Sequence, residues 1–478
     1  MHLGLDLGTS GLKGLLIDDE QVILAEAASP MVATRPYDGW SEQRPLEWIS
    51  AAKNVLNMLH RKVGLSSLQS IGLSGQMHGA TLLDKSDRVL RPCILWNDTR
   101  SHAEAAAMDI DPEFRIVSGN IVFPGFTAPK LRWVKKHEPQ VFDQVAKVLL
   151  PKDFLRLWLT GDHVTDMSDA AGTGWLNTGQ RSWSDGLLAK TALRQDQMPR
   201  LVEGSEISGS LRQKLRNQFG ITQEVVVAGG GGDNAASGIG AGVSKAGDAF
   251  ASLGTSGVLF AACDGYSPDA ASAVHTFCHA IPNMWHQMGV ILSATDSLNW
   301  YCRLVGKDVL TLIGQLGTLQ APGKPVFLPY LGGERTPHNN ANARGAFIGL
   351  EHVTSTTAGA RAVVEGVVHA FRDNFNVLSS TGTKIERIMA VGGGSNSDYW
   401  LEALATSLNM PIDVPVSGDF GGAFGAARLG MMAVGASDEI ITRPPVYKTI
   451  QPNKDLIQAF IDAHEGYCEA YKMVKNLT

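Results

Sequence analysis

The sequence is poor in cysteine, and it lacks long hydrophobic runs and any concentration of positive charge. Its five cysteines are scattered without a Cys-X-X-Cys pair, which argues against a disulfide framework and against a zinc site. No apolar run is long enough to span a bilayer, and the first residues lack the basic segment of a signal peptide and reach a carboxylate at Asp6. The sequence therefore predicts a protein of the reducing cytoplasm.

Acidic residues slightly outnumber basic ones. The 41 Lys and Arg residues against 47 Asp and Glu residues give a net charge of −6, and no basic stripe stands out. This balance argues against nucleic acid and against an anionic membrane surface as the main partner. A phosphate-binding site would then have to be local and built from backbone N–H groups.

Chain length and glycine are what the sequence has in plenty. At 478 residues the chain is too long for one hydrophobic core, so two large domains are expected. A content of 44% hydrophobic and 18% charged residues suits an ordered protein. The 52 glycines allow the backbone to approach a ligand closely.

One pentapeptide, Leu-Gly-Thr-Ser-Gly, occurs twice, at Leu7–Gly11 and at Leu253–Gly257. Each copy lies between two short apolar runs, which is typical of a β-hairpin turn, here one that carries hydroxyl groups. Two such hairpins, one in each half, indicate two related domains that face one ligand. Only the first copy follows a carboxylate, Asp6, whereas the second follows Ser252.

The order of predicted elements is similar in the two halves. The first half is expected to hold strands at 3–7, 12–17 and 22–27, an amphipathic helix at 46–59, a strand at 70–74, added helices and loops over 97–221, and a buried strand at 225–228. The second half, from about residue 243, is expected to hold a hairpin at 250–262, more strands through 275–291, a strand at 387–391 and a helix at 397–408.

The first hairpin turn has the groups that a phosphate site needs. Successive N–H groups of such a turn can point at one anion, and Thr9 and Ser10 add hydroxyl donors. Asp6, at the strand end, is placed to hold a hydrated Mg²⁺, which usually takes one or two carboxylates together with phosphate oxygens and waters. An ordinary tight hairpin with a surface carboxylate is the alternative, and the second copy of the turn makes it the weaker one.

Gly229–Ala235 follows a predicted strand and begins a helix. Its later part fits the G-x-G-x-x-A dinucleotide pattern, but Asp233 would repel a pyrophosphate and the motif does not lie in a first βα unit, so we reject that interpretation. A carboxylate at a helix N-terminus is stabilised as the anion and can act as general base toward a substrate hydroxyl. A plain N-cap role explains Asp233 about equally well.

Gly392–Asn396 is a glycine-rich turn between a predicted strand and a helix. It has room for the flat face or the ribose of a nucleotide, although a sharp structural corner explains it as well. The Gly-Lys pairs at Gly306–Lys307 and Gly323–Lys324 are followed by Asp308 and Pro325 instead of Ser or Thr, so no Walker A motif is present. An enzyme that uses ATP would therefore not be of the P-loop class.

Three polar segments suit a sugar or phosphate ligand. Gln76–His78 lies between two glycines at a strand end, and Trp96–Arg100 combines an aromatic face with hydrogen-bonding groups; a structural loop and a core tryptophan are the alternatives. Glu334–His338 is a polar loop whose Arg335 either pairs with Glu334 or approaches a phosphate.

Two groups look like metal ligands at first. His275 and His279 are expected on a strand that separates them along one face, with Cys278 on the other, so strand histidines are the better interpretation. Asp166–Asp169 is explained as well by a turn with N-cap residues.

Five motifs occur in the order seen in the FGGY carbohydrate kinases, which the chain resembles over nearly its whole length. They are Asp6–Ser10, Gly125–His137, Gly232–Asn234, Leu253–Ser256 and Gly425–Ala427. Within this family, Gly75–Gly79, Trp96–Asp98 and Gly333–His338 are most similar to the branch that phosphorylates D-xylulose. The glycerol kinases differ, with Arg and Glu where Met77 and His78 stand here. An extra glycine in Gly229–Gly232 and a glycine-rich Gly421–Phe424 depart from the family pattern.

The resemblance implies an α/β fold of two actin-like, RNase H-like domains with the ATP and sugar cleft between them. The first domain, residues 1–242, would bind the sugar and carry the catalytic carboxylate, and the second, residues 243–478, would bind the nucleotide. Asp233 would be the base, and Asp6 would position Mg²⁺ through water. The residues expected to contact the sugar are Gln76, Met77, His78, Trp96, Asp233 and Asn234. Those expected to contact ATP are Gly8, Thr9, Ser10, Lys13, Gly254, Thr255, Ser256, Gly393, Gly394, Ser395 and Asn396.

Together these features predict ATP-dependent phosphorylation of D-xylulose at its 5-hydroxyl, giving D-xylulose 5-phosphate and ADP. Two alternatives stay open: a kinase for another ketopentose or a polyol, and a conformational ATPase of the same superfold. An oxidoreductase would rest on the Gly230–Ala235 pattern alone. The expected partners are the sugar and ATP; neither nucleic acid nor a membrane is expected, and a homodimer is left open.

Overall fold

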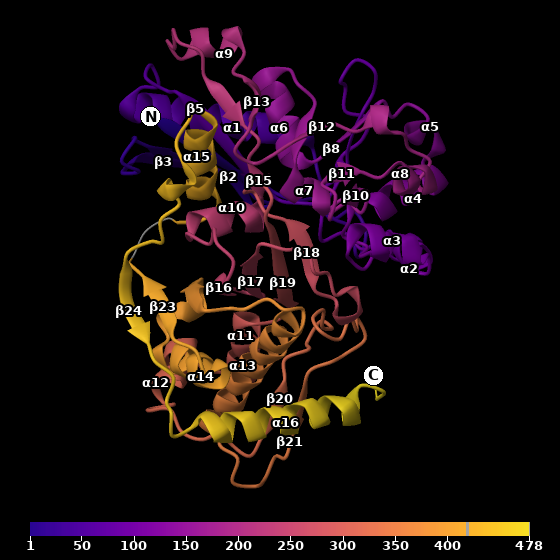
Figure 1. Cartoon of the computed structure of the whole chain (residues 1–478). Coiled ribbons are helices and arrows are strands. Elements are labelled where there is room, and N and C mark those ends of the chain that lie inside the picture. The colour runs from indigo at the N-terminus through magenta and orange to yellow at the C-terminus, as the bar shows by residue number, and fades with distance from the viewer. Residues whose placement is uncertain (417–419, 478) are drawn as a thin grey trace.

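A computed structural model describes residues 1–416 and 420–477 as two lobes, each built around a seven-stranded sheet (Figure 1). The N-terminal lobe carries most of residues 1–240, and the C-terminal lobe carries most of the rest. The long helix α16 (Ile457–Val474) crosses the far end of the C-terminal lobe. In the part of the chain that the structure describes, no helix combines the length and the apolar character needed to cross a bilayer.

The N-terminal sheet has the strand order β13-β14-β5-β1-β2-β3, with β15 also paired to β5. Its first strand, β1, is antiparallel to β2 and parallel to β5, and its leucines are fully buried. The bounds are β1 His2–Leu7, β2 Gly11–Ile17, β3 Ile23–Pro30, β5 Ser70–Gly75, β13 Ile207–Ser210, β14 Val226–Ala228 and β15 Gly231–Gly232. The strands predicted at 3–7, 12–17, 22–27, 70–74 and 225–228 are therefore confirmed.

Helix α1 (Pro45–Val63) covers one face of this sheet through the apolar stripe that its sequence predicts. Trp48, Val55 and Leu59 lie on that stripe and are fully buried. Proline at the first helical position has a backbone suited to a helix start, and Gly64, with φ 73°, ends the helix. The helix is longer at both ends than the predicted 46–59.

The region between β5 and β13 forms a subdomain of helices and loops, as its sequence predicts, together with small two-stranded sheets that were not predicted. Its helices are α2 His102–Asp109, α3 Pro112–Ser118, α4 Thr127–His137, α5 Pro139–Phe142, α6 Pro151–Thr160, α7 Met167–Ala171 and α8 Asp185–Lys190, followed by α9 Gln213–Gln218. Its strands are β6 Thr81–Leu83, β7 Cys93–Ile94, β8 Lys147–Leu149, β9 Val164–Asp166, β10 Leu176–Asn177, β11 Ser182–Trp183 and β12 Arg200–Val202. The earlier strand β4, Glu42–Gln43, pairs with β7.

The C-terminal sheet repeats the central arrangement of the N-terminal one, with the order β18-β19-β17-β16-β22-β23-β24. Strand β16 is antiparallel to β17 and parallel to β22, as β1 is to β2 and β5. The bounds are β16 Asp248–Leu253, β17 Gly257–Cys263, β18 His275–Cys278, β19 Trp285–Ile291, β22 Arg387–Val391, β23 Ile412–Pro415 and β24 Val446–Ile450, with a separate pair β20 Val326–Leu328 and β21 Ala346–Ile348. The two hairpins predicted from the repeated pentapeptide are confirmed.

Helices cover the C-terminal sheet and bury its main core. The 25-residue α13 (Thr356–Ser380) is the largest of them, and it packs with α11 (Thr295–Val305), α12 (Val309–Gly314) and α14 (Asp398–Leu408). Fully buried Val363, Val367 and Phe371 of α13 lie in this core. The strand at 387–391 and the helix predicted at 397–408 are confirmed, and the turn between them is a short 3₁₀ helix, Gly393–Asn396.

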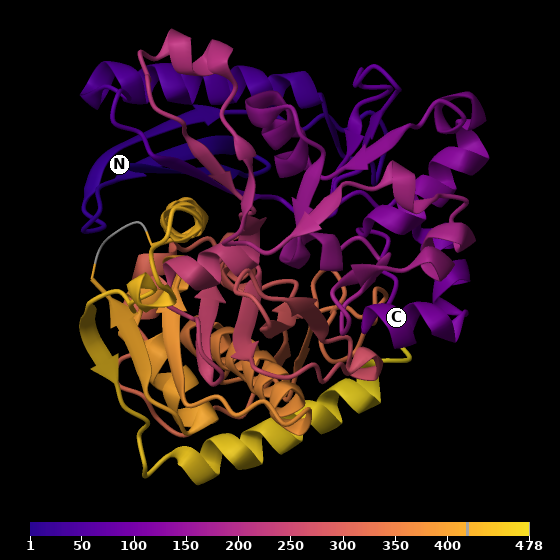
Figure 2. The ribbon, with the colours of Figure 1, turned by 45° about the horizontal axis from the view of Figure 1, so that its top comes forward.

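Helices α10 (Asp233–Gly240) and α15 (Gly422–Ala433) lie side by side between the lobes (Figures 1 and 2). Although α15 is late in the chain, it packs on β1 and β5 of the N-terminal sheet. This approach requires glycine: a Cβ on Gly72 of β5 would lie 1.6 Å from the carbonyl oxygen of Ala426. The division into domains at residue 242 stays a prediction.

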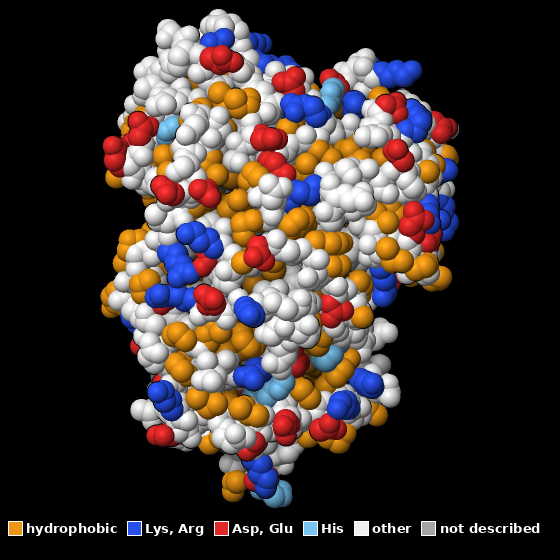
Figure 3. All heavy atoms as spheres, viewed as in Figure 1, with side chains coloured by type: hydrophobic (Ala, Val, Ile, Leu, Met, Phe, Trp, Pro, Cys, Tyr) orange, Lys and Arg blue, Asp and Glu red, His pale blue; other side chains and the backbone are white. Residues whose placement is uncertain are grey.

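Charged side chains of both signs are interspersed over the face shown in Figure 3, with hydrophobic side chains in small groups between them. This distribution accords with the near balance of 41 basic and 47 acidic residues. The expectation that nucleic acid and membranes are not partners stays a prediction.

Candidate active site

The first repeated turn connects β1 and β2, and its backbone closes through a hydrogen bond from Gly8 N–H to the carbonyl of Gly11 at 3.0 Å. Leu7 pairs with Leu12 across this hairpin, whereas in the second copy Leu253 pairs with Gly257. The identical pentapeptides therefore adopt turns of different length. A register shift of one residue turns side chains to the opposite face, so equal sequence does not give equal geometry here.

The hydroxyl of Thr9 lies between the turn and the predicted sugar loops. It donates to Gln76 Oε1 at 2.9 Å and accepts from Trp96 Nε1 at 3.0 Å. The Gln76 amide also donates to Gln43 Oε1 at 3.0 Å, and the Gln43 amide donates to the carbonyl of Thr9 at 2.7 Å. Gln76 is thus engaged in fixing the turn, while 46% of Trp96 remains exposed.

Asp6, at the end of β1, has one carboxylate oxygen without a hydrogen-bond partner among the described residues. Its Oδ1 accepts a hydrogen bond from Ser74 Oγ of β5 at 2.7 Å. Burial raises the pKa of this carboxyl, and the Ser74 hydrogen bond and the charge of Lys13 oppose that shift. Lys13 Nζ itself lies 3.0 Å from Glu26 Oε2. A hard cation held by Asp6 would relieve the cost of burying the anion, so the residue fits a hydrated Mg²⁺.

Asp233 is the first residue of α10, where the helix dipole favours a negative charge. Its Oδ1 accepts hydrogen bonds from the backbone N–H of Asn234 at 2.7 Å and from the Asn234 amide at 3.0 Å. Burial raises its pKa to about 6; the charge of Asp6 adds to the rise, and the Asn234 bonds oppose it. A carboxylate with a pKa near neutrality accepts a hydroxyl proton far better than an ordinary aspartate.

His78, three residues after the end of β5, has a constrained backbone. Its φ is 68°, a left-handed conformation that costs a non-glycine residue energy. The fully buried ammonium of Lys130 holds this conformation by donating to the carbonyls of His78 at 2.8 Å and of Gly125 at 2.7 Å. The imidazole stacks on Phe126 with the ring centres 4.8 Å apart.

The imidazole of His78 is neutral, and its hydrogen bond fixes both the orientation of the ring and the nitrogen that carries the proton. Its Nδ1 donates to the carbonyl of Gly172 at 2.6 Å. Burial and the charge of Lys130 lower the pKa of His78 to about 3, and burial lowers the pKa of Lys130 to about 7. With Nδ1 protonated, Nε2 is an acceptor, which is the group that a sugar hydroxyl needs.

Met77, in the predicted sugar-binding segment Gln76–His78, contacts the residue that precedes α10. It is buried, and it packs against Gly232, where an added Cβ would lie 2.8 Å from the Met77 sulfur. Met77, His78, Asp233 and Asn234 are therefore brought to one region, as their predicted role in binding the sugar requires.

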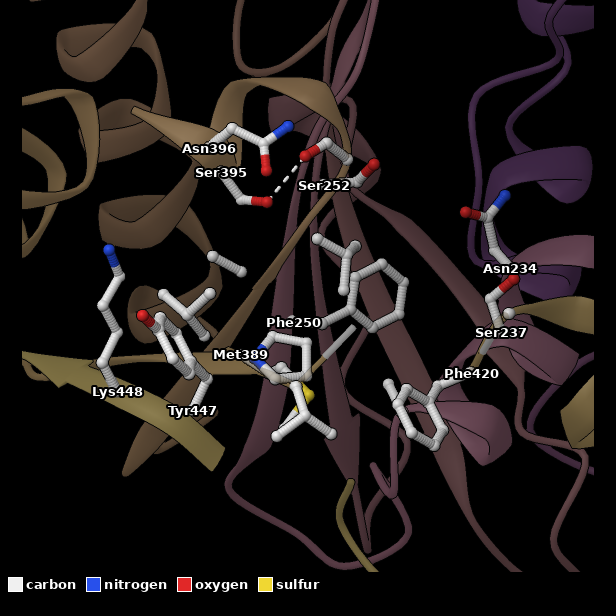
Figure 4. Close-up of a pocket in the computed structure, with 18 residues that line it drawn as sticks. Asn234, Ser237, Phe250, Ser252, Met389, Ser395, Asn396, Phe420, Tyr447 and Lys448 are labelled. Atoms are coloured by element: carbon white, nitrogen blue, oxygen red, sulfur yellow. Dashed lines mark hydrogen bonds between the residues drawn. The ribbon is translucent and has the colours of Figure 1, made fainter. Parts of the chain in front are cut away.

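A pocket of about 750 Å³ lies between α10 and the C-terminal sheet (Figure 4). Asn234 and Ser237 face it from α10, and Ser395 and Asn396 face it from the glycine-rich turn. The remaining lining is Ala241, Phe250, Ser252, Met389, Ala390, Val391, Gly392, Val414, Pro415, Val416, Phe420, Gly421, Tyr447 and Lys448. The pocket therefore has an apolar wall and a polar rim, as sites for flat ligands usually do.

The predicted nucleotide residues divide into two groups. Ser395 and Asn396 line this pocket, whereas the turns at Gly8–Ser10 and Gly254–Ser256 and the glycines Gly393 and Gly394 do not. The carbonyl of Gly254 accepts from Thr295 Oγ1 at 2.7 Å, which fixes the second turn against α11. Tyr447 and Lys448 were not predicted, because β24 reaches the pocket through pairing with β23 and has no motif of its own.

A cluster of buried charges lies next to Gly75, which precedes the predicted sugar-binding segment Gln76–His78. Lys152 Nζ is 2.7 Å from Asp153, 2.7 Å from Asp166 and 3.1 Å from Asp169, and all four side chains are fully buried. Asp166 also caps α7, as the turn interpretation expected. Burial raises the pKa of Asp169 well above its usual value, and the charge of Lys152 opposes that rise.

Side chains in and beside this cluster form hydrogen bonds with the turn that precedes Asp233. Buried Arg156 donates to the carbonyls of Ala228 and Gly229. Ser168 Oγ of α7 accepts from the backbone N–H of Gly232 at 3.0 Å and donates to Asp166. The sequence alone did not indicate these contacts, since Arg156 and Ser168 lie far from the turn along the chain.

Arg335, from the C-terminal half of the chain, lies close enough to the predicted sugar-binding residue His78 for its charge to lower the pKa of that histidine. Its guanidinium lies 4.7 Å from the ring centre of Phe123 and 3.4 Å from His275 Nε2. Glu334 Oε1 accepts from the N–H groups of Arg335 and Leu292, and burial raises the pKa of Glu334 to about 8. His275 lies in β18 and His279 directly after it; burial lowers the pKa values of both.

The twin hairpin sheets, the inter-lobe helices and the carboxylates at the ends of β1 and β15 define a two-lobed α/β protein of the actin-like ATPase type. The chain belongs to the FGGY family of carbohydrate kinases: the N-terminal domain of this family matches residues 1–240, and its C-terminal domain matches residues 249–434. It is thus a phosphotransferase that acts on a sugar and ATP.

Relatives and solved structures agree with this assignment over full lengths. The xylulose kinase of Escherichia coli (strain K12) is 44% identical over 480 residues, 99% of each chain, and that of Klebsiella pneumoniae is 44% identical over 485 residues, 100% of each. A crystal structure of a xyloylose kinase from Brucella ovis has a TM-score of 0.98 and 56% identity, with both chains covered completely. The xylulose kinase from Rhodospirillum rubrum has a TM-score of 0.93 at 26% identity, covering 100% of this chain and 99% of that one.

Proposed function

We propose that this kinase transfers the γ-phosphoryl group of ATP to the 5-hydroxyl of D-xylulose, giving D-xylulose 5-phosphate and ADP. The observation that carries the proposal is the position of Asp233. Its carboxyl has a pKa of about 6, and it lies between the sugar loop at Met77 and the pocket that Asn234 lines. Full-length relatives that are described as xylulose kinases support the choice of sugar.

Asp233 acts as the general base. It takes the proton of the 5-hydroxyl as the bond from that oxygen to the γ-phosphorus forms, and the bond from phosphorus to the β,γ-bridging oxygen breaks with ADP as leaving group. Asn234 aligns the Asp233 carboxylate through two hydrogen bonds. The neutral Nε2 of His78 accepts a sugar hydroxyl, and Met77, Gln76 and Trp96 shape the loops around it.

The two turns and the inter-lobe pocket divide the work on ATP. Gly8, Thr9, Ser10 and Lys13 from the first turn and Gly254, Thr255 and Ser256 from the second would face the phosphates. Ser395 and Asn396, which line the pocket, and the adjacent Gly393 and Gly394 would hold the adenosine end. Asp6 would hold Mg²⁺ through water; when bound, the ion neutralises charge on the phosphates.

We extend the proposal to the roles of the two domains, the cellular compartment and the assembly of the protein. Residues 1–242 would form the sugar-binding domain and residues 243–478 the nucleotide-binding domain, and closure of the lobes would exclude water as a competing acceptor. Five free cysteines suit a reducing cytoplasm. A homodimer is the assembly to test, and nucleic acid and membranes are not proposed as partners.

The position of the transferred group tests this proposal. ³¹P NMR of the product of D-xylulose and ATP should show a phosphorus coupled to the C5 protons. Coupling to C1 protons would contradict the assignment of the acceptor hydroxyl. A second candidate function, a kinase for another ketopentose or a polyol, would be recognised by faster turnover of that sugar.

A further inference from the structure

Three metal-ligating side chains meet on the far side of the C-terminal lobe, away from the proposed catalytic site. Asp373 belongs to α13, and His464 and Cys468 belong to α16. One ligand atom from each lies within 4.8 Å of the other two. His464 Nε2 is 2.8 Å from Asp373 Oδ1, and Cys468 Sγ is 3.7 Å from each of these atoms.

The arrangement converges on one point. His464 and Cys468 are four residues apart on α16, so their side chains project from the same helix face. The carboxylate and the thiol both approach the same imidazole nitrogen, Nε2, so they do not form a relay through the two nitrogens of the ring. His338 faces the other carboxylate oxygen, with its Nε2 4.0 Å from Asp373 Oδ2.

We propose that Asp373, His464 and Cys468 bind one divalent transition-metal ion of the zinc class. Carboxylate, imidazole and thiolate are the ligand types that such ions prefer, and a shift of a few tenths of an ångström places all three atoms on one tetrahedral centre. Burial raises the pKa of the Cys468 thiol to about 12. Binding therefore releases one proton to solvent, as the sulfur–metal bond replaces the sulfur–hydrogen bond.

The ion would stabilise the position of the loop that carries Arg335, because α16 packs against that loop. Tyr467 of α16 shares a hydrogen bond of 2.6 Å with Tyr330, and Tyr471 stacks on His338 with ring centres 3.8 Å apart. The amide of Asn340 donates to the Tyr471 hydroxyl at 3.2 Å. Tying α16 to α13 thereby restrains residues 334–340 without touching the reacting groups.

Cobalt(II) titration of the full-length protein after chelator dialysis tests the proposal. Wild type should bind one ion and develop a thiolate-to-cobalt charge-transfer band with tetrahedral visible bands, which Zn²⁺ abolishes. Cys468→Ser should lose the charge-transfer band, and His464→Gln should weaken cobalt binding by at least about tenfold. Zn²⁺ should raise the Tm of wild type and leave that of Cys468→Ser unchanged.

Cys302→Ser is the matched control, since Cys302 is another free cysteine of the same lobe and is not one of the three proposed ligands. It should keep the cobalt spectrum and the increase in Tm. A wild-type protein without a thiolate band would overturn the proposal, and so would an unchanged band in Cys468→Ser. Kinase activity with D-xylulose is read separately and does not decide the result.

Discussion

The backbone N–H of Gly232, the residue before the proposed base Asp233, donates a hydrogen bond of 3.0 Å to the hydroxyl of Ser168. Ser168 in turn donates to Asp166, a member of the buried charge cluster around Lys152. The start of α10 is thus attached to a buried ionic network as well as to its own strand. A base positioned through such contacts depends on residues that never touch the sugar.

Ser168→Ala removes the acceptor of the Gly232 N–H. We expect kcat to fall by about fivefold, since a neutral hydrogen bond contributes about 1 kcal/mol and that free energy would be lost from the alignment of Asp233. The KM for ATP should change less. Ser50→Ala, at an exposed hydroxyl on α1, is the matched control and should behave as wild type. An unchanged kcat in Ser168→Ala would show that the buried network does not contribute to the alignment of Asp233.

Lys152→Met tests the charge balance of the cluster. Removing the ammonium leaves buried Asp153 and Asp166 without this cation, and we expect the free energy of unfolding at pH 7 to fall by about 3–5 kcal/mol. Asp169→Asn should cost far less, because burial raises the pKa of this carboxyl and so favours its neutral form, which asparagine resembles. Urea unfolding measures the loss in both variants. Equal losses in the two variants would contradict this expectation.

The sequence predicted the parts of the site that are local in the chain. The hairpins around Asp6 and Ser252 and the start of α10 at Asp233 follow from apolar runs and from turn residues, although the N-cap of α10 is Gly232 and no side chain caps this helix. It did not predict how Lys130 holds the left-handed His78, because that contact joins segments 52 residues apart. Tertiary contacts of this kind leave no periodic signal in either segment.

The two copies of the repeated pentapeptide show the same limit. Their identity predicted two hairpins, yet their strand registers differ. The first turn is held by Gln43, Gln76 and Trp96, and the second by Thr295. Each turn is set by the segments that pack against it, which five residues cannot encode.

The pH dependence of kcat/KM should report Asp233. The carboxylate must be ionised to accept a proton, so activity should fall about tenfold per pH unit below a pKa of about 6. His78 does not titrate in this range, since its pKa is about 3. Initial rates measured as the pH is lowered from 8 give the pH at which half of the activity is lost. A midpoint near pH 4, the pKa of an exposed aspartate, would contradict burial as the cause of the shift.

Asp6→Asn keeps the shape of the side chain and removes its charge. If Asp6 positions hydrated Mg²⁺, the Mg²⁺ concentration for half-maximal activity should rise about tenfold, the equivalent of about 1.4 kcal/mol. Asp455→Asn, at an exposed carboxylate, is the control and should leave the Mg²⁺ titration unchanged. A wild-type titration in Asp6→Asn would argue that another group positions the ion.

The most direct measurement is a coupled ADP assay over a panel of ketoses and polyols with wild type and Asp233→Asn. Wild type should form ADP fastest with D-xylulose, with the highest kcat/KM of the panel. Asp233→Asn should lose about 10²–10⁴-fold in kcat, the range for removal of a general base, while its affinity for ADP stays near wild type. Turnover of Asp233→Asn within a few fold of wild type, or ADP formation that does not depend on the sugar, would contradict the account.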